Sequence, residues 1–331
     1  MPQEIRLATF NVLNLSMPGM QLYDNLAPHS VAEYEAKTSW IAQQMDLLNA
    51  DVIGFQEIFS QAALKHVLSK TQSYQQAHHV GFDPDPLAER LTPSVALVSR
   101  LPLAGPATAF SDFSRNLSIS LPDDAGRAAG SSHFTRPVLH AQVKVSDDLA
   151  INVFVVHLKS KRPDFLDSEL EDDPHHFGMA SLRSLIRRGT EALGLRYLLT
   201  DFAQGNRIPL VVMGDFNDVA GAVTTQMVLG AGRSSKTGFD HRLFDCYRIR
   251  TRRDPLRDVG YTDIREDRYE TIDHILVSEE FNPASRFAIG EVTDVTYLND
   301  HVALKLPEAS DHGQVVACIS LFGNLQAPSV P

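Results

Sequence analysis

The sequence predicts an α/β fold in which β-sheets pack face to face and helices cover their outer sides. Short apolar runs rich in β-branched and aromatic residues recur from one end of the chain to the other. Several of these runs lack polar alternation, which is typical of strands buried on both faces. Segments with helical spacing separate only some of the runs, so the regular alternation of a doubly wound Rossmann sheet is missing.

Eight apolar runs are predicted to be strands. Each is four to eight residues long and is rich in the residue types that strands favour. No internal repeat and no low-complexity linker divides the chain, so we expect a single domain over residues 1–331. The predicted strands are Ile5–Phe10, Val52–Phe55, Val95–Val98, Val138–Val145, Ile151–Val156, Pro209–Met213, Ile272–Val277 and Val315–Ile319.

Three helices are predicted from apolar residues that recur three and four positions apart. They cover residues 31–49, 60–68 and 179–202. In the third helix one face is expected to carry Leu182, Leu185, Ile186, Leu193 and Tyr197.

Two charged segments are interpreted as surface loops, because charge runs usually face water. An acidic insertion is expected at about residues 163–178, with six carboxylates between Pro163 and Pro174. A basic segment covers residues 242–257 and carries six arginines.

The net charge limits the choice of partners. Thirty Lys and Arg stand against 41 Asp and Glu, which gives a formal charge of −11. A chain this acidic does not hold nucleic acid through bulk charge, so a phosphate substrate must meet a local basic surface.

The chain is expected to be a cytoplasmic protein with two reduced thiols. Cys246 and Cys318 form no CxxC pattern and no Cys/His cluster, which excludes a zinc finger and a disulfide framework. No run approaches eighteen apolar residues, and the first residues show no basic and apolar leader, so we expect neither a membrane span nor a signal peptide.

Polar residues follow the predicted strands at the points where the strands end. Asn11, Glu57, His157 and Asp215 each come directly after a buried apolar run, and Asn217 follows two residues later. Ionisable groups at the edge of a buried strand lose hydration energy. Several of them together therefore indicate a shared metal ion or charged ligand.

These strand ends carry short motifs that resemble the endonuclease/exonuclease/phosphatase superfamily. The motifs appear in family order over residues 9–312, nearly the whole chain. They are Thr9-Phe10-Asn11, Gln56-Glu57, His157-Leu158, Gly214-Asp215-Phe216-Asn217, Ile272-Asp273-His274-Ile275-Leu276 and Ser310-Asp311-His312. The resemblance implies a four-layered α/β sandwich, with two mixed sheets face to face, helices outside and the active site at one end of the strands.

The resemblance also implies a divalent metal site. Glu57 corresponds to the main carboxylate ligand, with Asn11 and Asp311 as further ligands. Oxygen-only ligation selects a hard ion, so we expect Mg²⁺ or Mn²⁺. Apurinic-site endonucleases of the superfamily often carry a carboxylate where this chain has Leu13, so a second metal site of that design is in doubt.

The remaining motif residues imply hydrolysis of a phosphodiester by in-line attack of water. By the resemblance, Asp215 activates the water, Asn217 binds the phosphoryl oxygens, and His312 contacts the phosphate while Asp273 orients its ring. His157 is similar to the histidine that deoxyribonucleases use for leaving-group protonation or phosphate binding.

Basic residues beside these motifs favour a nuclease that acts on DNA. Arg136 resembles an arginine that deoxyribonucleases direct at the phosphate. Three cations, Lys159, Lys161 and Arg162, follow His157 closely enough to bind flanking phosphates. The arginines of residues 242–257 are expected to line the same groove. The alternative is a phosphatase or phosphodiesterase for a small molecule such as a phosphoinositide, a nucleotide or a sphingomyelin-like lipid. No obligate protein partner is expected.

Overall fold

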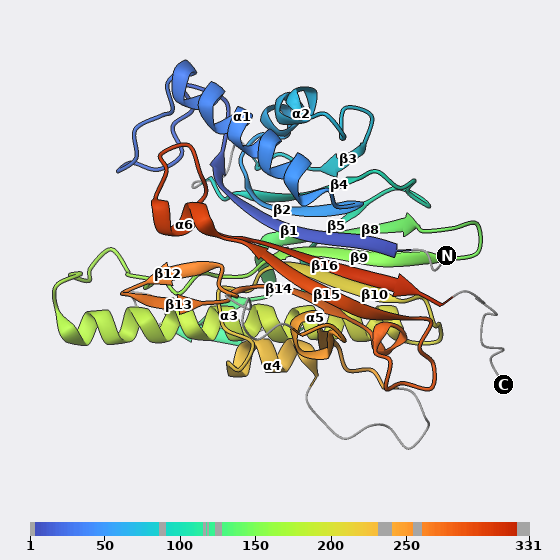
Figure 1. Ribbon diagram of the computed structural model, residues 1–331. Helices are drawn as coiled ribbons and strands as arrows, with labels where there is room; N and C mark the ends of the chain where they lie inside the picture. The colour runs from blue at the N-terminus through green and yellow to red at the C-terminus, as the bar shows by residue number, and fades with distance from the viewer. Residues whose placement is uncertain are drawn as a thin grey trace.

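Two six-stranded mixed sheets lie face to face in the computed structural model, with helices on both outer sides (Figure 1). The structure describes residues 4–85, 91–114, 117, 119–122, 128–230, 240–253 and 260–322. In order across the first sheet lie β15 (Gly290–Leu298), β16 (Gln314–Leu321), β1 (Glu4–Leu15), β2 (Val52–Ile58), β4 (Ser94–Ser99) and β3 (His78–Gly81). Across the second lie β11 (Phe244–Asp245), β14 (Asp273–Val277), β10 (Leu210–Asp215), β9 (Ala150–His157), β8 (His133–Lys144) and β5 (Thr108–Asp112).

The helices complete a four-layered sandwich. α1 (Val31–Leu48) and α2 (Gln61–Lys70) cover the first sheet, and α3 (Pro174–Ala203) and α4 (Val223–Leu229) cover the second (Figure 1). The shorter elements are the pair β6 (Ile119–Pro122) and β7 (Ala128–Ser131), the hairpin β12 (Asp263–Arg265) and β13 (Arg268–Glu270), α5 (Cys246–Ile249), α6 (Asp300–Leu304) and the 3-10 helix η2 (Glu279–Phe281). This architecture confirms the predicted fold class.

The two sheets repeat one pairing pattern, and that pattern positions the site. β1 and β2 form a parallel pair in the first sheet, and β9 and β10 form a parallel pair in the second. The other pairs in both sheets are antiparallel. The two parallel pairs face each other across the sandwich, so their carboxyl ends meet at one edge, where Asn11, Glu57, His157 and Asp215 lie.

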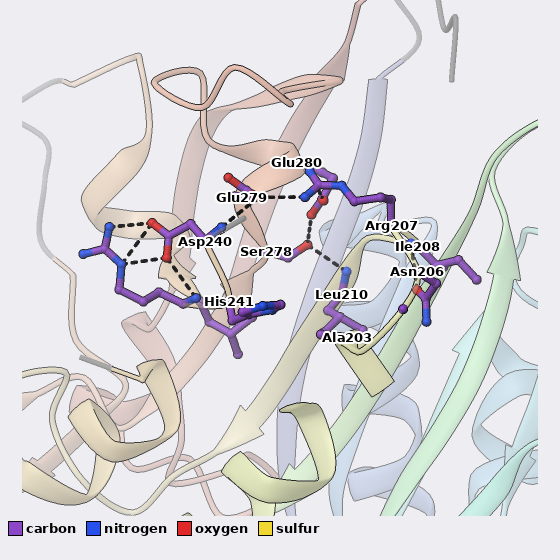
Figure 2. Close-up of a pocket in the computed structure, with 13 residues that line it drawn as sticks. Ala203, Asn206, Arg207, Ile208, Leu210, Asp240, His241, Ser278, Glu279 and Glu280 are labelled. Carbon is purple, nitrogen blue, oxygen red and sulfur yellow. Dashed lines mark hydrogen bonds and ion pairs between the residues drawn. The ribbon is translucent and has the colours of Figure 1, made fainter. Parts of the chain in front are cut away.

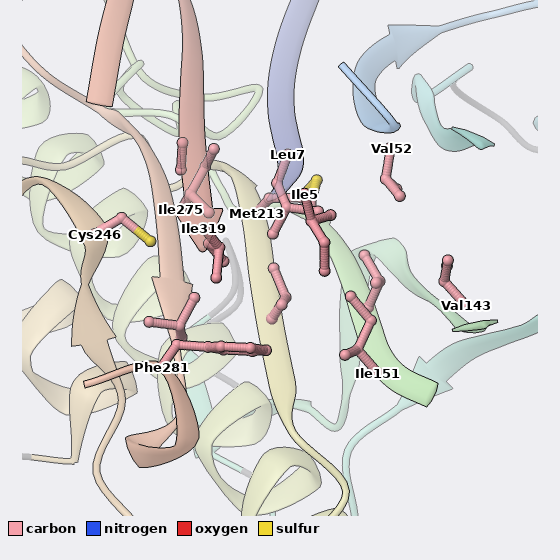
Figure 3. Close-up of a cluster of buried hydrophobic side chains, with 14 of the residues drawn as sticks. Ile5, Leu7, Val52, Val143, Ile151, Met213, Cys246, Ile275, Phe281 and Ile319 are labelled. Atoms are coloured by element: carbon pink, nitrogen blue, oxygen red, sulfur yellow. The ribbon is translucent and has the colours of Figure 1, made fainter. Parts of the chain in front are cut away.

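Three buried clusters separate the four layers. One fills the space between the sheets, with Ile5 and Leu7 of β1 against Met213 of β10 (Figure 3). The other two lie between the first sheet and α1 and α2, and between the second sheet and α3 and α4. Gly54 lets the sheets approach, because a Cβ there would stand 2.8 Å from the sulfur of Met213.

The predicted strands are all confirmed, and α1 begins where its capping residues require. The Ser30 side chain accepts from the backbone N–H of Glu33 at 3.3 Å, and the Glu33 carboxylate accepts from the N–H of Ser30 at 2.8 Å. Asn49 ends the helix in the left-handed conformation. Strand β15 and helices α4 to α6 were not predicted.

The expected apolar face of α3 is wrong. In its second half the core side chains are Leu195, Leu198 and Leu199, while Leu193 and Tyr197 are only half-buried. The first half buries charged residues instead. Leu182 and Leu185 are 47% and 48% exposed, whereas Arg183 and Arg188 are buried. The Arg183 guanidinium binds Glu169, and Arg188 Nε lies 3.1 Å from Asp218 Oδ2. In the first half of α3, ion pairs therefore decide which face is buried. The spacing of apolar residues in the sequence cannot show such pairs.

The acidic insertion is shorter than expected. Its last five residues, 174–178, form the start of α3, and the Asp173 carboxylate caps the helix by accepting from the N–H groups of His175 and His176 at 2.8 and 3.1 Å. Asp164 binds Arg187 at 2.8 Å. Within the described residues, no helix is long and apolar enough to cross a membrane.

Candidate active site

Unusual backbone geometry marks the edge where the two parallel pairs end. Leu13, Asn14, Glu57 and Asn217 have φ values of 53°, 56°, 64° and 54°. Residues other than glycine rarely adopt this left-handed backbone conformation, and those that do cluster at functional sites. The register of β2 against β4 shifts between Gln56 and Ile58, so a bulge turns Glu57 out of the sheet pattern.

Asn11 connects the carboxylates of the two sheets. Its amide nitrogen lies 3.4 Å from Glu57 Oε1 and 3.2 Å from Asp215 Oδ2. Its oxygen accepts from the N–H of Leu13 at 3.1 Å, and Glu57 Oε2 accepts from the N–H of Asn14 at 3.0 Å. In this arrangement Asn11 orients both carboxylates as a donor, and its oxygen is already bonded within the chain.

A buried cluster of two carboxylates and two histidines lies beside Asn11. His312 Nδ1 is 2.9 Å from Asp273 Oδ2, and His312 Nε2 is 3.9 Å from Asp215 Oδ2. His157 Nε2 is 3.4 Å from the same Asp215 oxygen. The structure thus brings together His157, Asp215, Asp273 and His312 from three strands and the loop before β16.

Burial and mutual charge shift the pKa values of this cluster. Burial and the nearby Asp273 carboxylate raise the pKa of Asp215 to about 7. Burial opposes charge on His312, but Asp273 and Asp215 outweigh it and hold the pKa of His312 well above its usual value. Burial, with Arg136 nearby, holds the pKa of His157 well below its usual value. At neutral pH, His312 is therefore the cationic ring and His157 the neutral one.

Replacing Asp273 with Asn is expected to lower the pKa of His312, because the amide no longer stabilises the imidazolium. NMR titration of the His312 ring signals measures this shift, with His312→Gln identifying them. The raised pKa stabilises the folded wild type below about pH 6.5, and this stabilisation disappears as pH rises through the folded-state pKa. The variant should lose that part of the pH dependence of unfolding. An unchanged His312 titration would contradict the pairing.

Two hydroxyl groups, those of Thr262 and Ser310, hold the His312 loop and the start of β14 in place. The Thr262 hydroxyl accepts from the N–H groups of Ile272 and Asp273 at 3.0 and 3.2 Å. The Ser310 hydroxyl donates to the carbonyl of Asn11 at 2.7 Å and accepts from the N–H of His312 at 3.0 Å. Thr262 was not predicted, since a threonine eleven residues before Asp273 gives no signal in the sequence.

Asn217 and Arg136 contact one carbonyl beside the cluster. The Asn217 amide donates to the carbonyl of Leu158 at 3.0 Å, and its N–H donates to Asp215 Oδ1 at 2.7 Å. Arg136 Nη1 donates to the same Leu158 carbonyl at 3.3 Å. Both side chains thus lie next to Asp215 and His157, as a role in phosphate binding requires.

The two lysines predicted to bind substrate are occupied by internal partners. Lys159 Nζ donates to the carbonyls of Ser160 and Arg162 at 3.2 and 3.1 Å, and burial lowers the pKa of Lys159 to about 8. Lys161 Nζ lies 3.2 Å from Glu270 Oε2 and 3.5 Å from Asp218 Oδ1. Both ammonium groups are thus bonded to oxygen atoms of the protein. A phosphate would have to displace these oxygens before it could bind either lysine.

Two of the arginines of residues 242–257, Arg242 and Arg252, do not line this site, so that expectation is wrong for them. Arg242 pairs with Asp240 beside a cavity of about 210 Å³ near Leu210, the end of β10 opposite Asp215 (Figure 2). The backbone N–H of Arg252 donates to the carbonyl of Thr293 in β15. The neighbouring Val292 is in register with Ile5 through β16, so Arg252 lies near the start of β1, away from Asn11. Arg257 lies outside the described residues.

The donors at this edge fit a hard divalent ion. Asp311 is exposed, and among the described residues no hydrogen bond or ion pair occupies its carboxylate, while Glu57 is half-buried with lone pairs left after its two bonds. Oxygen donors of this kind suit Mg²⁺ or Mn²⁺. Asp215, Asp273 and His312 also offer ligand atoms within 4.8 Å of one another, although the His312–Asp273 bond uses one pair of them.

Solved structures with the same fold come from several organisms. The human nocturnin catalytic domain with a bound sulfate has 17% identity and a TM-score of 0.58, covering 96% of this chain and 95% of that chain. A mannosyl-6-phosphatase from Bacteroides thetaiotaomicron has 15% identity and a TM-score of 0.55, covering 96% and 100%. An endonuclease/exonuclease/phosphatase from Bacteroides vulgatus has 18% identity and a TM-score of 0.57, covering 97% and 100%. At these identities the likeness shows the fold alone.

The sequence itself shows the family. No curated protein matches the chain in sequence. The family model described as Endonuclease/Exonuclease/phosphatase family matches residues 8–312. The chain therefore belongs to the endonuclease/exonuclease/phosphatase family, whose members hydrolyse phosphoester bonds and generally depend on a divalent metal ion.

Proposed function

We propose that this protein is a Mg²⁺- or Mn²⁺-dependent hydrolase of small phosphoesters that uses Asp215 as the base for the attacking water. The carrying observation is the buried cluster in which Asp215, with a pKa raised to about 7, lies 3.4 Å from His157 and 3.9 Å from His312. A base is most effective when its pKa lies near the working pH. Asp215 meets this condition at neutral pH.

The chain's own residues support a single in-line displacement. Asp215 takes the proton of the water, and Asn217 donates a hydrogen bond to the phosphoryl oxygens. His312 is held as an imidazolium by Asp273 and contacts the phosphate. His157 is neutral, which favours a hydrogen bond to the phosphate over protonation of the leaving group.

Glu57 and Asp311 would hold the divalent ion, with Asn11 orienting Glu57. When bound, the ion supplies positive charge that stabilises the additional negative charge on the phosphate in the transition state. No residue of the cluster needs to form a covalent intermediate in this scheme.

The charges around the site favour a small phosphoester over duplex DNA. Lys159 and Lys161 are bound internally, and Arg242 and Arg252 lie away from the site. The half-buried Asp263 carboxylate faces His312 and Asp311 and adds negative charge at the same edge. A duplex would need several free cations to neutralise its phosphates.

A DNA nuclease is the second candidate, favoured by Arg136 and His157 beside Asp215. The test compares supercoiled plasmid, short single strands, bis-p-nitrophenyl phosphate, sugar phosphates and nucleotides, each with Mg²⁺ or Mn²⁺. EDTA and the His312→Ala variant serve as controls. We expect metal-dependent turnover of small esters and intact plasmid. Efficient plasmid nicking that EDTA and His312→Ala abolish would establish the nuclease instead.

A further inference from the structure

A lysine is buried on the inner face of α1. Lys37 is 4% exposed, as deeply buried as its apolar neighbours on this face. Within the described part of the chain, no hydrogen bond or ion pair reaches its ammonium group. Lysine is almost never buried without a partner, because removing its charge from water is costly. A nearby negative charge would offset this cost.

The packing of α1 places Lys37 at the edge that carries the site. Trp40, three residues on and on the same face, contacts the ring of Phe10 at 5.8 Å and that of His301 at 4.9 Å. His301 Nε2 is bonded to the carbonyl of His312 at 2.8 Å. α1 connects the parallel strands β1 and β2, so it runs antiparallel to both (Figure 1). Moving back from Trp40 to Lys37 therefore leads about 4.5 Å beyond Phe10, towards Asn11 and Glu57.

The charges that act on Lys37 agree with this position. Burial lowers the pKa of Lys37 to about 8, and the carboxylates of Asp311 and Glu57 oppose this shift. Glu57 and Asp311 are the two residues assigned above to the divalent ion.

We propose that Lys37 is a fixed cation beside Glu57 and Asp311 that limits the site to one divalent ion. This inference rests on the proposed function, since it assumes that these two carboxylates bind the ion. Two carboxylates balance one divalent ion, and the ammonium charge opposes binding of a second. Lys37 acts through its charge on the ion that the two carboxylates would hold.

The first measurement uses the wild-type protein and Mn²⁺ alone. Isothermal titration calorimetry at neutral pH should give one Mn²⁺ per chain. Two tightly bound ions would overturn the proposal. No binding at all would overturn the proposed metal site together with this inference. The stoichiometry needs no variant, so it can overturn the proposal even if substitutions at Lys37 prevent folding.

The second measurement compares Lys37→Met with Lys37→Arg and Lys65→Met. Met keeps the length of the side chain and removes the charge, so we expect Mn²⁺ to bind about tenfold more tightly, because one charge no longer repels the ion. Lys37→Arg and Lys65→Met, the latter on the exposed face of α2, should bind as the wild type does. Loss of packing would only weaken binding, so tighter binding is not what a purely structural role produces. Equal or weaker binding in Lys37→Met, with one ion in the wild type, would overturn this inference alone.

Discussion

Replacing Asp215 with Asn is expected to lower kcat by roughly 10²- to 10⁴-fold, the contribution of a well-placed general base. The amide has nearly the same shape but does not accept the proton of the attacking water. Its oxygen keeps the bond from the N–H of Asn217, which lies 2.7 Å from Asp215 Oδ1. The fold should therefore persist, and steady-state hydrolysis of a small diester together with circular dichroism measures both properties.

Asp218 provides a matched control for this substitution. It follows the same strand and is also buried, but its carboxylate binds Arg188 and the hydroxyl of Thr224 rather than the histidines. We expect Asp218→Asn to affect stability more than kcat. An Asp215→Asn enzyme with nearly wild-type turnover would remove Asp215 from the role of base.

Replacing Glu57 with Gln is expected to weaken Mn²⁺ binding by about 100-fold and to lower activity at limiting metal. The substitution removes one of the two charges assigned to the ion. Gln still accepts the N–H of Asn14, which lies 3.0 Å from Glu57 Oε2, so the left-handed backbone at φ 64° should remain. Calorimetry with Mn²⁺ measures the affinity, and turnover at increasing Mn²⁺ measures its effect on rate.

Glu171→Gln is the control for this second variant, because Glu171 is an exposed carboxylate of the acidic loop. Glu171→Gln changes the net charge of the protein by the same amount as Glu57→Gln. Because Glu171 is not assigned to the ion, we expect this variant to bind Mn²⁺ as tightly as the wild type. Wild-type affinity in Glu57→Gln as well would mean that the ion binds elsewhere, for example at Asp215, Asp273 and His312.

The fold could be predicted from the sequence because strands buried between layers leave a clear apolar signal. Val52 to Phe55 and Val153 to Val156 have no polar alternation, and both are fully buried in the structure. The side chains at the strand ends could be predicted for the same reason, since Glu57 and Asp215 interrupt apolar runs. Strand β15 was missed because polar residues such as Glu291 and Asp294 interrupt its apolar pattern.

The charged contacts could not be predicted, because they depend on distances that only the folded chain sets. Lys161 pairs with Glu270 of the β12–β13 hairpin, 109 residues away, so a lysine that looks free in the sequence is ion-paired in the structure. From the sequence alone, Lys37 would be assigned to the exposed polar face of an amphipathic helix. Its burial becomes visible only when α1 packs over the ends of β1 and β2.

The most direct test of the central claim is hydrolysis of bis-p-nitrophenyl phosphate by protein stripped of metal with EDTA and then titrated with Mn²⁺. We predict no turnover before titration, full turnover once one Mn²⁺ per chain has bound, and none in His312→Ala at any Mn²⁺ concentration. Turnover that persists without metal, or that His312→Ala retains, would contradict the assignment of this edge of the sandwich as a metal-dependent phosphoesterase site.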